Sequence, residues 1–72
     1  MEIRVEHEWE IQEQLKKEGF KILAPSNGCY RKINDAMEMA NKLETQYNDV
    51  LVVNHKYCGM GNGYFVMGRD MN

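Results

Sequence analysis

The stretch Tyr57-Cys58-Gly59-Met60-Gly61-Asn62-Gly63-Tyr64-Phe65 lies between two apolar runs, Val50-Leu51-Val52-Val53 and Tyr64-Phe65-Val66-Met67. Three of the six glycines of the chain alternate within it. A glycine-dense segment between strand-like runs is typical of a turn, or of a place where a ligand approaches the backbone closely. The stretch therefore predicts two C-terminal strands, most simply an antiparallel pair, and a connection of uncertain length between them.

Two connections fit this stretch. If Asn62-Gly63 forms a tight type I′ turn, the two strands run directly up to it. If Val53 pairs with Tyr64, residues 55–63 form a long loop between the strands. We expect the long loop, because glycines weaken a regular strand.

The N-terminal half predicts a strand, a helix and a second strand. Apolar and polar residues alternate over residues 2–7, which is the period of a strand with one buried face. Residues 9–18 are rich in helix formers and are followed by Gly19, a residue that commonly ends helices. The second strand spans Phe20–Ala24, and Pro25-Ser26-Asn27-Gly28 closes it with turn residues.

A helix over residues 33–47 has the clearest pattern in the chain. Its apolar residues recur at helical spacing and form one continuous stripe: Ile33, Ala36, Met37, Ala40, Leu43 and Tyr47. Glu38 and Lys42 form a favourable pair on the opposite, wet side.

These elements predict a single small α+β domain spanning residues 1–72. The expected order is β-α-β-α-β-β, with one mainly antiparallel sheet whose C-terminal hairpin packs on helix 33–47. Both C-terminal strands are apolar on both faces. Two helices, one of them short, are not expected to bury both faces of a four-stranded sheet. We therefore expect self-association, with a homodimer as the simplest case.

Composition bounds the function classes. The net charge of −2 argues against nucleic-acid binding through phosphate contacts. The longest apolar runs have four residues, which is too short to cross a membrane. No charged leader followed by an apolar core opens the chain, so we expect a cytoplasmic protein in which Cys29 and Cys58 are free thiols.

The C-terminal third is nearly uncharged and aromatic, which favours contact with a protein partner. Tyr, Phe, Met and Arg are enriched at interfaces, and Tyr and Arg among the residues that dominate binding energy. The predicted protein-binding residues are Tyr57, Met60, Tyr64, Phe65 and Arg69. We expect about half of this aromatic and methionine cluster to be buried, with Tyr57 and Met60 the most available.

An alternative from another class is a small-ligand protein that binds or sequesters a phosphate or nucleotide, acting as a homo-oligomer. Its ligand loop would consist of Gly59, Gly61, Asn62 and Gly63, with backbone N–H groups around the anion. Phosphate-binding loops open a helix, however, whereas a strand follows here. A turn or a bulge is the simpler interpretation of the glycines.

Metal binding and catalysis have weaker support. His7, Cys29, His55 and Cys58 would make a tetrahedral zinc set, but only His55 and Cys58 have a chelating spacing. Buried cysteine is commonly a small hydrophobe, so we expect no metal and no cofactor. No nucleophile turn is recognisable, and we expect a protein that is not an enzyme.

The chain as a whole resembles the small α+β accessory proteins of phages and mobile elements of Gram-positive bacteria. The resemblance rests on a composition rich in Glu, Lys, Asn and Met, on the helix leading into Asp-Val-Leu-Val-Val, and on the closing Asn-Gly-Tyr-Phe-Val-Met-Gly hairpin. It implies a binder or inhibitor of host proteins and assigns no functional residue.

Overall fold

The computed structural model describes residues 3–8, 10–58 and 61–71, and for residues 55–58, 61 and 62 it describes the backbone alone. The expected order of strands and helices is confirmed. The elements are β1 (Arg4–Glu6), α1 (Ile11–Lys17), β2 (Lys21–Ala24), α2 (Ile33–Leu43), β3 (Tyr47–Cys58) and β4 (Gly61–Asp70). Neither helix in the described part of the chain is long and apolar enough to cross a membrane.

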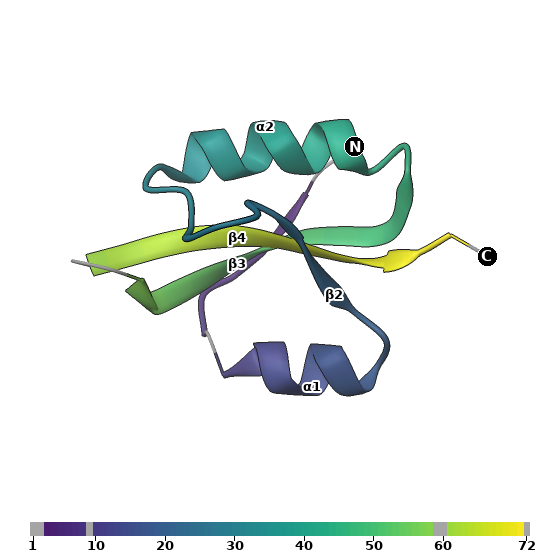
Figure 1. Ribbon diagram of the computed structural model, residues 1–72, viewed down its shortest axis with the longest axis horizontal. Helices are drawn as coiled ribbons and strands as arrows, with labels where there is room; N and C mark the ends of the chain where they lie inside the picture. Colours follow the sequence, from purple (N-terminus) through teal and green to yellow (C-terminus); the bar gives the residue numbers. More distant parts are fainter. Residues whose placement is uncertain (1–2, 9, 59–60, 72) are drawn as a thin grey trace.

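The four strands form one mixed sheet in the order β1-β3-β4-β2. β1 is parallel to β3, whereas β4 is antiparallel to both of its neighbours, β3 and β2. Strands β1, β2 and β3 therefore run in the same direction, and each helix is a crossover between two of them. The first crossover moves from one edge of the sheet to the other and the second moves back. Because crossovers share one hand, the two helices lie on opposite faces, as Figure 1 shows.

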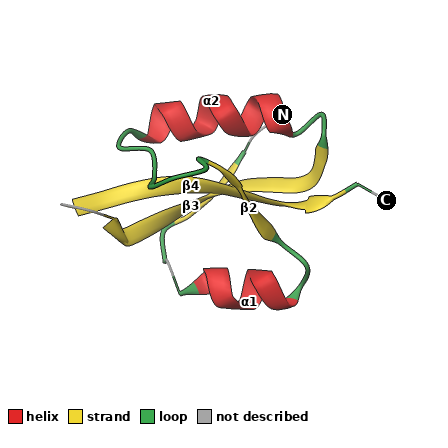
Figure 2. Ribbon diagram, in the orientation of Figure 1, coloured by secondary structure: helices red, strands yellow, loops and turns green. Residues whose placement is uncertain are grey.

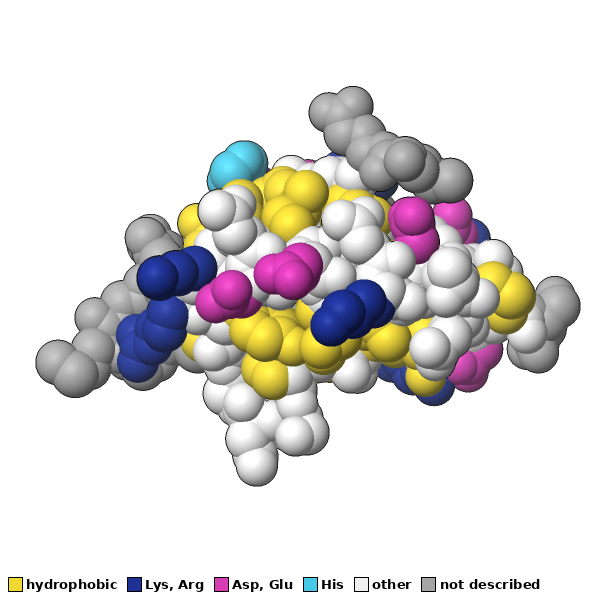
Figure 3. Space-filling model, turned by 90° about the horizontal axis from the view of Figure 1, so that it is seen from above, with side chains coloured by type: hydrophobic (Ala, Val, Ile, Leu, Met, Phe, Trp, Pro, Cys, Tyr) yellow, Lys and Arg dark blue, Asp and Glu magenta, His cyan; other side chains and the backbone are white. Residues whose placement is uncertain are grey.

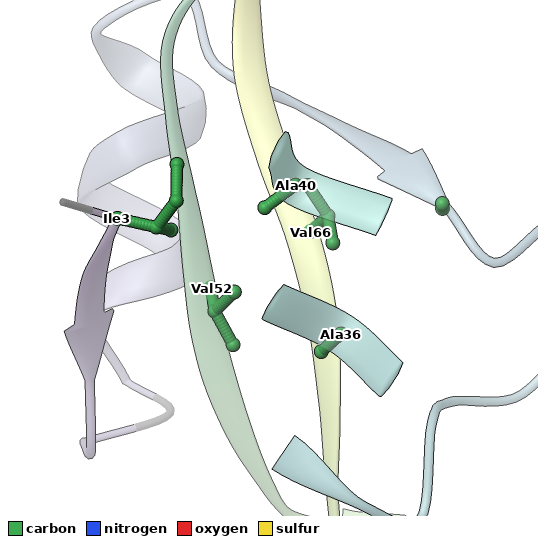
Figure 4. Close-up of a cluster of buried hydrophobic side chains, with 6 residues drawn as sticks. Ile3, Ala36, Ala40, Val52 and Val66 are labelled. Carbon is green, nitrogen blue, oxygen red and sulfur yellow. The ribbon is translucent and has the colours of Figure 1, made fainter. Parts of the chain in front are cut away.

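Helix α2 packs on one face of the sheet through its two alanines. Ala36 and Ala40 have no exposed surface, and they lie over Val52 and Val66, which are likewise fully buried (Figure 4). Alanines one helical turn apart let the helix backbone approach the strands closely. Ile3 completes this side of the core. The expected packing of the C-terminal hairpin on this helix is confirmed.

The short helix α1 covers the other face. Its Leu15 packs with a set of buried residues from the strands and from the segment before β2: Phe20, Leu51, Val53, Phe65 and Met67. Consecutive residues of the two central strands therefore point into two separate cores, and none of Leu51–Val53 or Phe65–Met67 exceeds 4% exposure. One copy of the chain buries both strand faces, so the uncovered faces from which we inferred self-association do not exist.

The predicted helix over residues 33–47 is too long by one turn. Helix α2 ends at Leu43, and Tyr47 is the first residue of β3, where it pairs with Asp70. Tyr47 falls at helical spacing from Leu43 in the sequence, but it does not belong to the helix. Pairing along the full length of β4 outweighs that local preference.

The predicted connection between the last two strands is also wrong. β3 reaches Cys58, β4 begins at Gly61, and these two residues pair, so residues 55–63 do not form a long loop. A turn at Asn62-Gly63 is equally wrong, because Gly63 pairs with His55 inside the ladder. The register shifts between His55 and Cys58, and such an irregularity accommodates glycines that would weaken a regular pairing.

Candidate interface: the hairpin arm

The hairpin of β3 and β4 extends beyond the rest of the sheet. The last pair between β1 and β3 joins Glu6 to Val53, and on the other side Tyr30 forms an isolated bridge with Tyr64. From the Asn54–Tyr64 pair outward, residues 54–58 and 61–64 form a ribbon of two strands, which we call the hairpin arm. Figures 1 and 2 show this end of the hairpin projecting past both helices.

The bridge at Tyr30 fixes the direction of the backbone groups in the arm. Tyr30 N–H donates to Tyr64 C=O at 2.8 Å, and Tyr64 N–H donates to Tyr30 C=O at 2.8 Å. The backbone groups of Tyr64 therefore point away from β3. In an antiparallel ladder, the residue opposite such a position also points its backbone groups outward. Asn54 pairs with Tyr64, so its N–H and C=O face the side of β3 on which β1 lies, where the parallel pairing of Glu6 with Val53 engages the Asn54 N–H.

The predicted protein-binding residues are not brought together. Tyr64 is half-buried and contacts the core beneath α2, and Phe65 is 4% exposed within the core on the α1 side. Arg69 is exposed, but it lies at the opposite end of β4 from the arm. The side chain of Tyr57 and the whole of Met60 fall outside the described residues.

The predicted ligand loop lies within the arm instead of forming an open loop. Gly61, Asn62 and Gly63 belong to β4, and Gly63 is buried. Gly59 falls outside the described residues. Backbone groups committed to a ladder are not arranged around an anion, so the described part of this segment offers no cradle of the predicted kind.

Cys29 is disulfide-bonded, which contradicts the expectation of free thiols. The other cysteine of the chain is Cys58, whose side chain lies outside the described residues. Disulfides persist in oxidising environments, so the cysteines give no reason to place the protein in a reducing cytosol. A disulfide-bonded Cys29 also provides no thiolate for the zinc set. Among the described residues, no three His, Cys, Asp or Glu side chains gather as a metal site would require.

A groove at the opposite end of the sheet was not predicted. Its volume is about 360 Å³, and its lining comes from β1, α1, the segment before β2, and the ends of β3 and β4: Arg4, Leu15, Glu18, Phe20, Asp49, Val50, Leu51 and Arg69. Two acidic and two basic residues are among these, so the formal charges of the lining cancel.

Two of the lining residues, Asp49 and Arg69, form an ion pair. Arg69 Nε donates to Asp49 Oδ2 at 3.0 Å and its NH2 group contacts the same oxygen, while the guanidinium lies 5.1 Å from the centre of the Phe20 ring. Asp49 has a φ of 56°, and the ladder shifts register between Asn48 and Leu51. This bulge directs the Asp49 carboxylate to Arg69. No local sequence pattern reveals a bulge of this kind, so the sequence offered no signal for the groove.

A second charged cluster lies on the other side of the same strand ends. Lys21 Nζ is 2.7 Å from Asp70 Oδ1 and 5.4 Å from the centre of the Tyr47 ring. The hydrogen bond to Asp70 raises the pKa of Lys21 above its ordinary value. The cluster is exposed and joins the edge strand to the end of β4.

Comparisons with protein-family models, with curated proteins and with solved structures gave no match for this chain. The fold and the arm define the class: a small α+β domain with a helix on each face of a mixed sheet and a projecting two-stranded arm.

Proposed function

We propose that this protein is a non-enzymatic binding protein that engages a protein partner through its C-terminal hairpin. The observation that carries the proposal is the hairpin arm, which extends beyond both helices and beyond the last pairs with β1 and β2. Gly63 and Tyr64 anchor the base of this ribbon in the domain, and the remainder extends beyond it as a candidate contact surface.

The residue types found in the hairpin arm also support it as the binding surface. Tyr57 and Tyr64 belong to the arm, and tyrosine is prominent among residues that dominate binding energy. Arg69 is held by Asp49 at the far end of β4 and does not join this surface. The resemblance to phage accessory proteins would make the partner a host protein, which the arm would inhibit or redirect.

The other large surface is less suited to selective contact. Over α2, acidic and basic side chains are interspersed with hydrophobic ones, as Figure 3 shows from above. A surface of mixed sign is typical of a solvated helix face.

Site-specific photocrosslinking tests the proposal. A photoreactive amino acid replaces Tyr57 in one variant and Glu38, an exposed residue of α2, in a matched control. Both variants are produced in a bacterial host, and crosslinked proteins are identified by mass spectrometry. We expect one specific adduct from the arm and none from α2.

Affinity for the protein so identified is then measured with purified variants. Tyr57→Ala is expected to weaken binding by about tenfold or more, as for a residue at the centre of an interface. Lys42→Ala on α2 serves as control and should bind like the unmodified chain. Equal adducts from both crosslinker positions, or an unchanged affinity of Tyr57→Ala, would show that the arm is not the binding surface.

A further inference from the structure

We infer that the disulfide of Cys29 is made with Cys58 and links the hairpin arm to the loop after β2, so that reduction by a dithiol loosens the arm and weakens partner binding. The covalent bond stands independently of the proposed function, whereas its effect on binding rests on that function.

The number of cysteines assigns the bond. The chain has two cysteines, Cys29 and Cys58. Cys29 is disulfide-bonded, and there is no free cysteine among the residues that the structure describes. Within one copy of the chain, Cys58 is the one residue with which Cys29 can form a disulfide. The backbone of Cys58 lies at the end of β3, in the arm, where it pairs with Gly61.

The two cysteines belong to segments that already meet at the base of the arm. Cys29 directly precedes Tyr30, whose N–H and C=O are both hydrogen-bonded to Tyr64 at 2.8 Å. A disulfide requires the two Cα atoms to lie within about 7 Å of each other. The register shift between His55 and Cys58 favours this approach, because a bulge bends the strand that carries it and increases its twist.

The bond fixes the arm at a second point. Beyond the base, the pairs from His55 to Cys58 join the two strands of the arm to each other. A ribbon of two strands is by itself marginally stable. A bond at Cys58 ties the outer end of β3 to the loop that Tyr30 holds at the base. A partner then meets an arm that is already ordered, which lowers the entropic cost of binding.

Opening the disulfide takes two electrons and two protons, and a dithiol reductant supplies both. One thiolate of the reductant attacks a sulfur of the disulfide and releases one cysteine, and its second thiol then displaces the other cysteine. The products are the thiols of Cys29 and Cys58 and the disulfide form of the reductant. An oxidised dithiol restores the bond by the reverse reaction.

Peptide mapping tests the assignment of the bond. The full chain is alkylated under denaturing, non-reducing conditions and digested with trypsin, which cleaves after lysine and arginine. Mass spectrometry should then find residues 22–31 joined to residues 57–69. Separately alkylated peptides would show that the bond is absent, and residues 22–31 joined to a second copy of themselves would show that it connects two chains. Either result would overturn the inference.

Backbone ¹⁵N relaxation measures the effect on the arm. On addition of a dithiol reductant, the order parameters of residues 54–58 and 61–64 should fall from about 0.85 to below about 0.6, while those of Val52 and Val66 stay high. A variant with both Cys29→Ser and Cys58→Ser should have the loosened arm with or without reductant. An arm that stays rigid on reduction, or a reduced chain that unfolds entirely, would show that the bond does not act on the arm.

Partner affinity separates the two proposals. The oxidised chain should bind the crosslinked partner about tenfold more tightly than the reduced chain does. The double serine variant should bind like the reduced chain and should not respond to reductant. If the arm loosens while the affinity is unchanged, the redox effect on binding is wrong and the proposed function stands. If the arm captures no partner, the proposed function fails, and the peptide map and the relaxation data still decide whether the bond orders the arm.

Discussion

The backbone conformation of Asp49 gives a quantitative test of the groove. Its φ of 56° lies in the left-handed region, which Asn and Gly adopt readily and Ala does not. Three substitutions distinguish the effect of the positive φ from the effect of the ion pair with Arg69. Asp49→Asn, Asp49→Gly and Asp49→Ala all remove the carboxylate, but only alanine resists the left-handed conformation.

The expected magnitudes follow from the two contributions. The ion pair is about half exposed on each side, so its loss costs at most about 1 kcal/mol. Holding alanine in the left-handed region costs roughly 1–2 kcal/mol more. Asp49→Ala should therefore lower the free energy of unfolding by about 2 kcal/mol. Asp49→Asn should lower the free energy of unfolding by about 1 kcal/mol or less. Asp49→Gly should lower it by a similar amount: glycine adopts a positive φ readily, but it also makes the unfolded chain more flexible, and the two effects offset each other.

Urea denaturation followed by circular dichroism measures these differences. With a slope of about 1 kcal/mol per molar urea for so small a domain, the midpoint of Asp49→Ala should fall about 1 M below that of Asp49→Asn. High salt screens exposed charges and so weakens the ion pair of the unmodified chain. The difference in urea midpoint between the unmodified chain and Asp49→Asn should therefore disappear at high salt. High salt should leave the alanine variant destabilised. If Asp49→Ala is as stable as Asp49→Asn, the positive φ is not what makes this position sensitive.

Three further perturbations address the rest of the fold. Gly68→Ala should cost about 1 kcal/mol of unfolding free energy, since a Cβ there would lie 2.8 Å from Leu23 Cδ1, the end of a side chain that can shift, and 3.2 Å from Val50 Cγ2; an unchanged urea midpoint would contradict this. Asp70→Asn should lower the pKa of Lys21, because the hydrogen bond that raises it is lost, and an NMR titration of the lysine side chain measures this. A raised pKa stabilises the fold below the unfolded-state pKa, so the advantage over Asp70→Asn should be full at neutral pH and vanish as pH rises through the raised pKa. Cys29→Ser should cost about 2–5 kcal/mol, and reductant should lower the melting temperature of the unmodified chain but not of this variant.

The local patterns of the sequence predicted the elements and the antiparallel pairing of β3 with β4, but gave no order for the remaining strands. The stripe containing Ala36 and Ala40 identified α2, and the doubly apolar runs identified β3 and β4. These signals are local, because they depend on the period of a single element. The parallel pairing of Arg4 with Leu51, in contrast, is set by where two crossovers return the chain, which no single segment encodes.

The positions of the candidate site residues depend on long-range packing in the same way. Phe65 was assigned to an interface because its type is common there, but the short α1 helix buries it. The glycines were read as a loop because they weaken strands, yet the ladder continues through them with a register shift. The disulfide at Cys29 and the bulge at Asp49 each depend on the approach of segments distant in sequence. Residue type alone therefore does not place individual side chains, which depend on how the segments pack together.

The burial of both strand faces changes where a partner can bind. Apolar runs on both sides of β3 and β4 first suggested that a second copy was needed to cover the sheet. With one helix on each face, that need disappears, and the groove near Asp49 has carboxylates and guanidinium groups in equal number. Among the described residues, the large exposed apolar side chains are Ile22 and Met71, which lie apart from the hairpin arm. The search for the proposed partner should therefore begin with the residues of the arm itself.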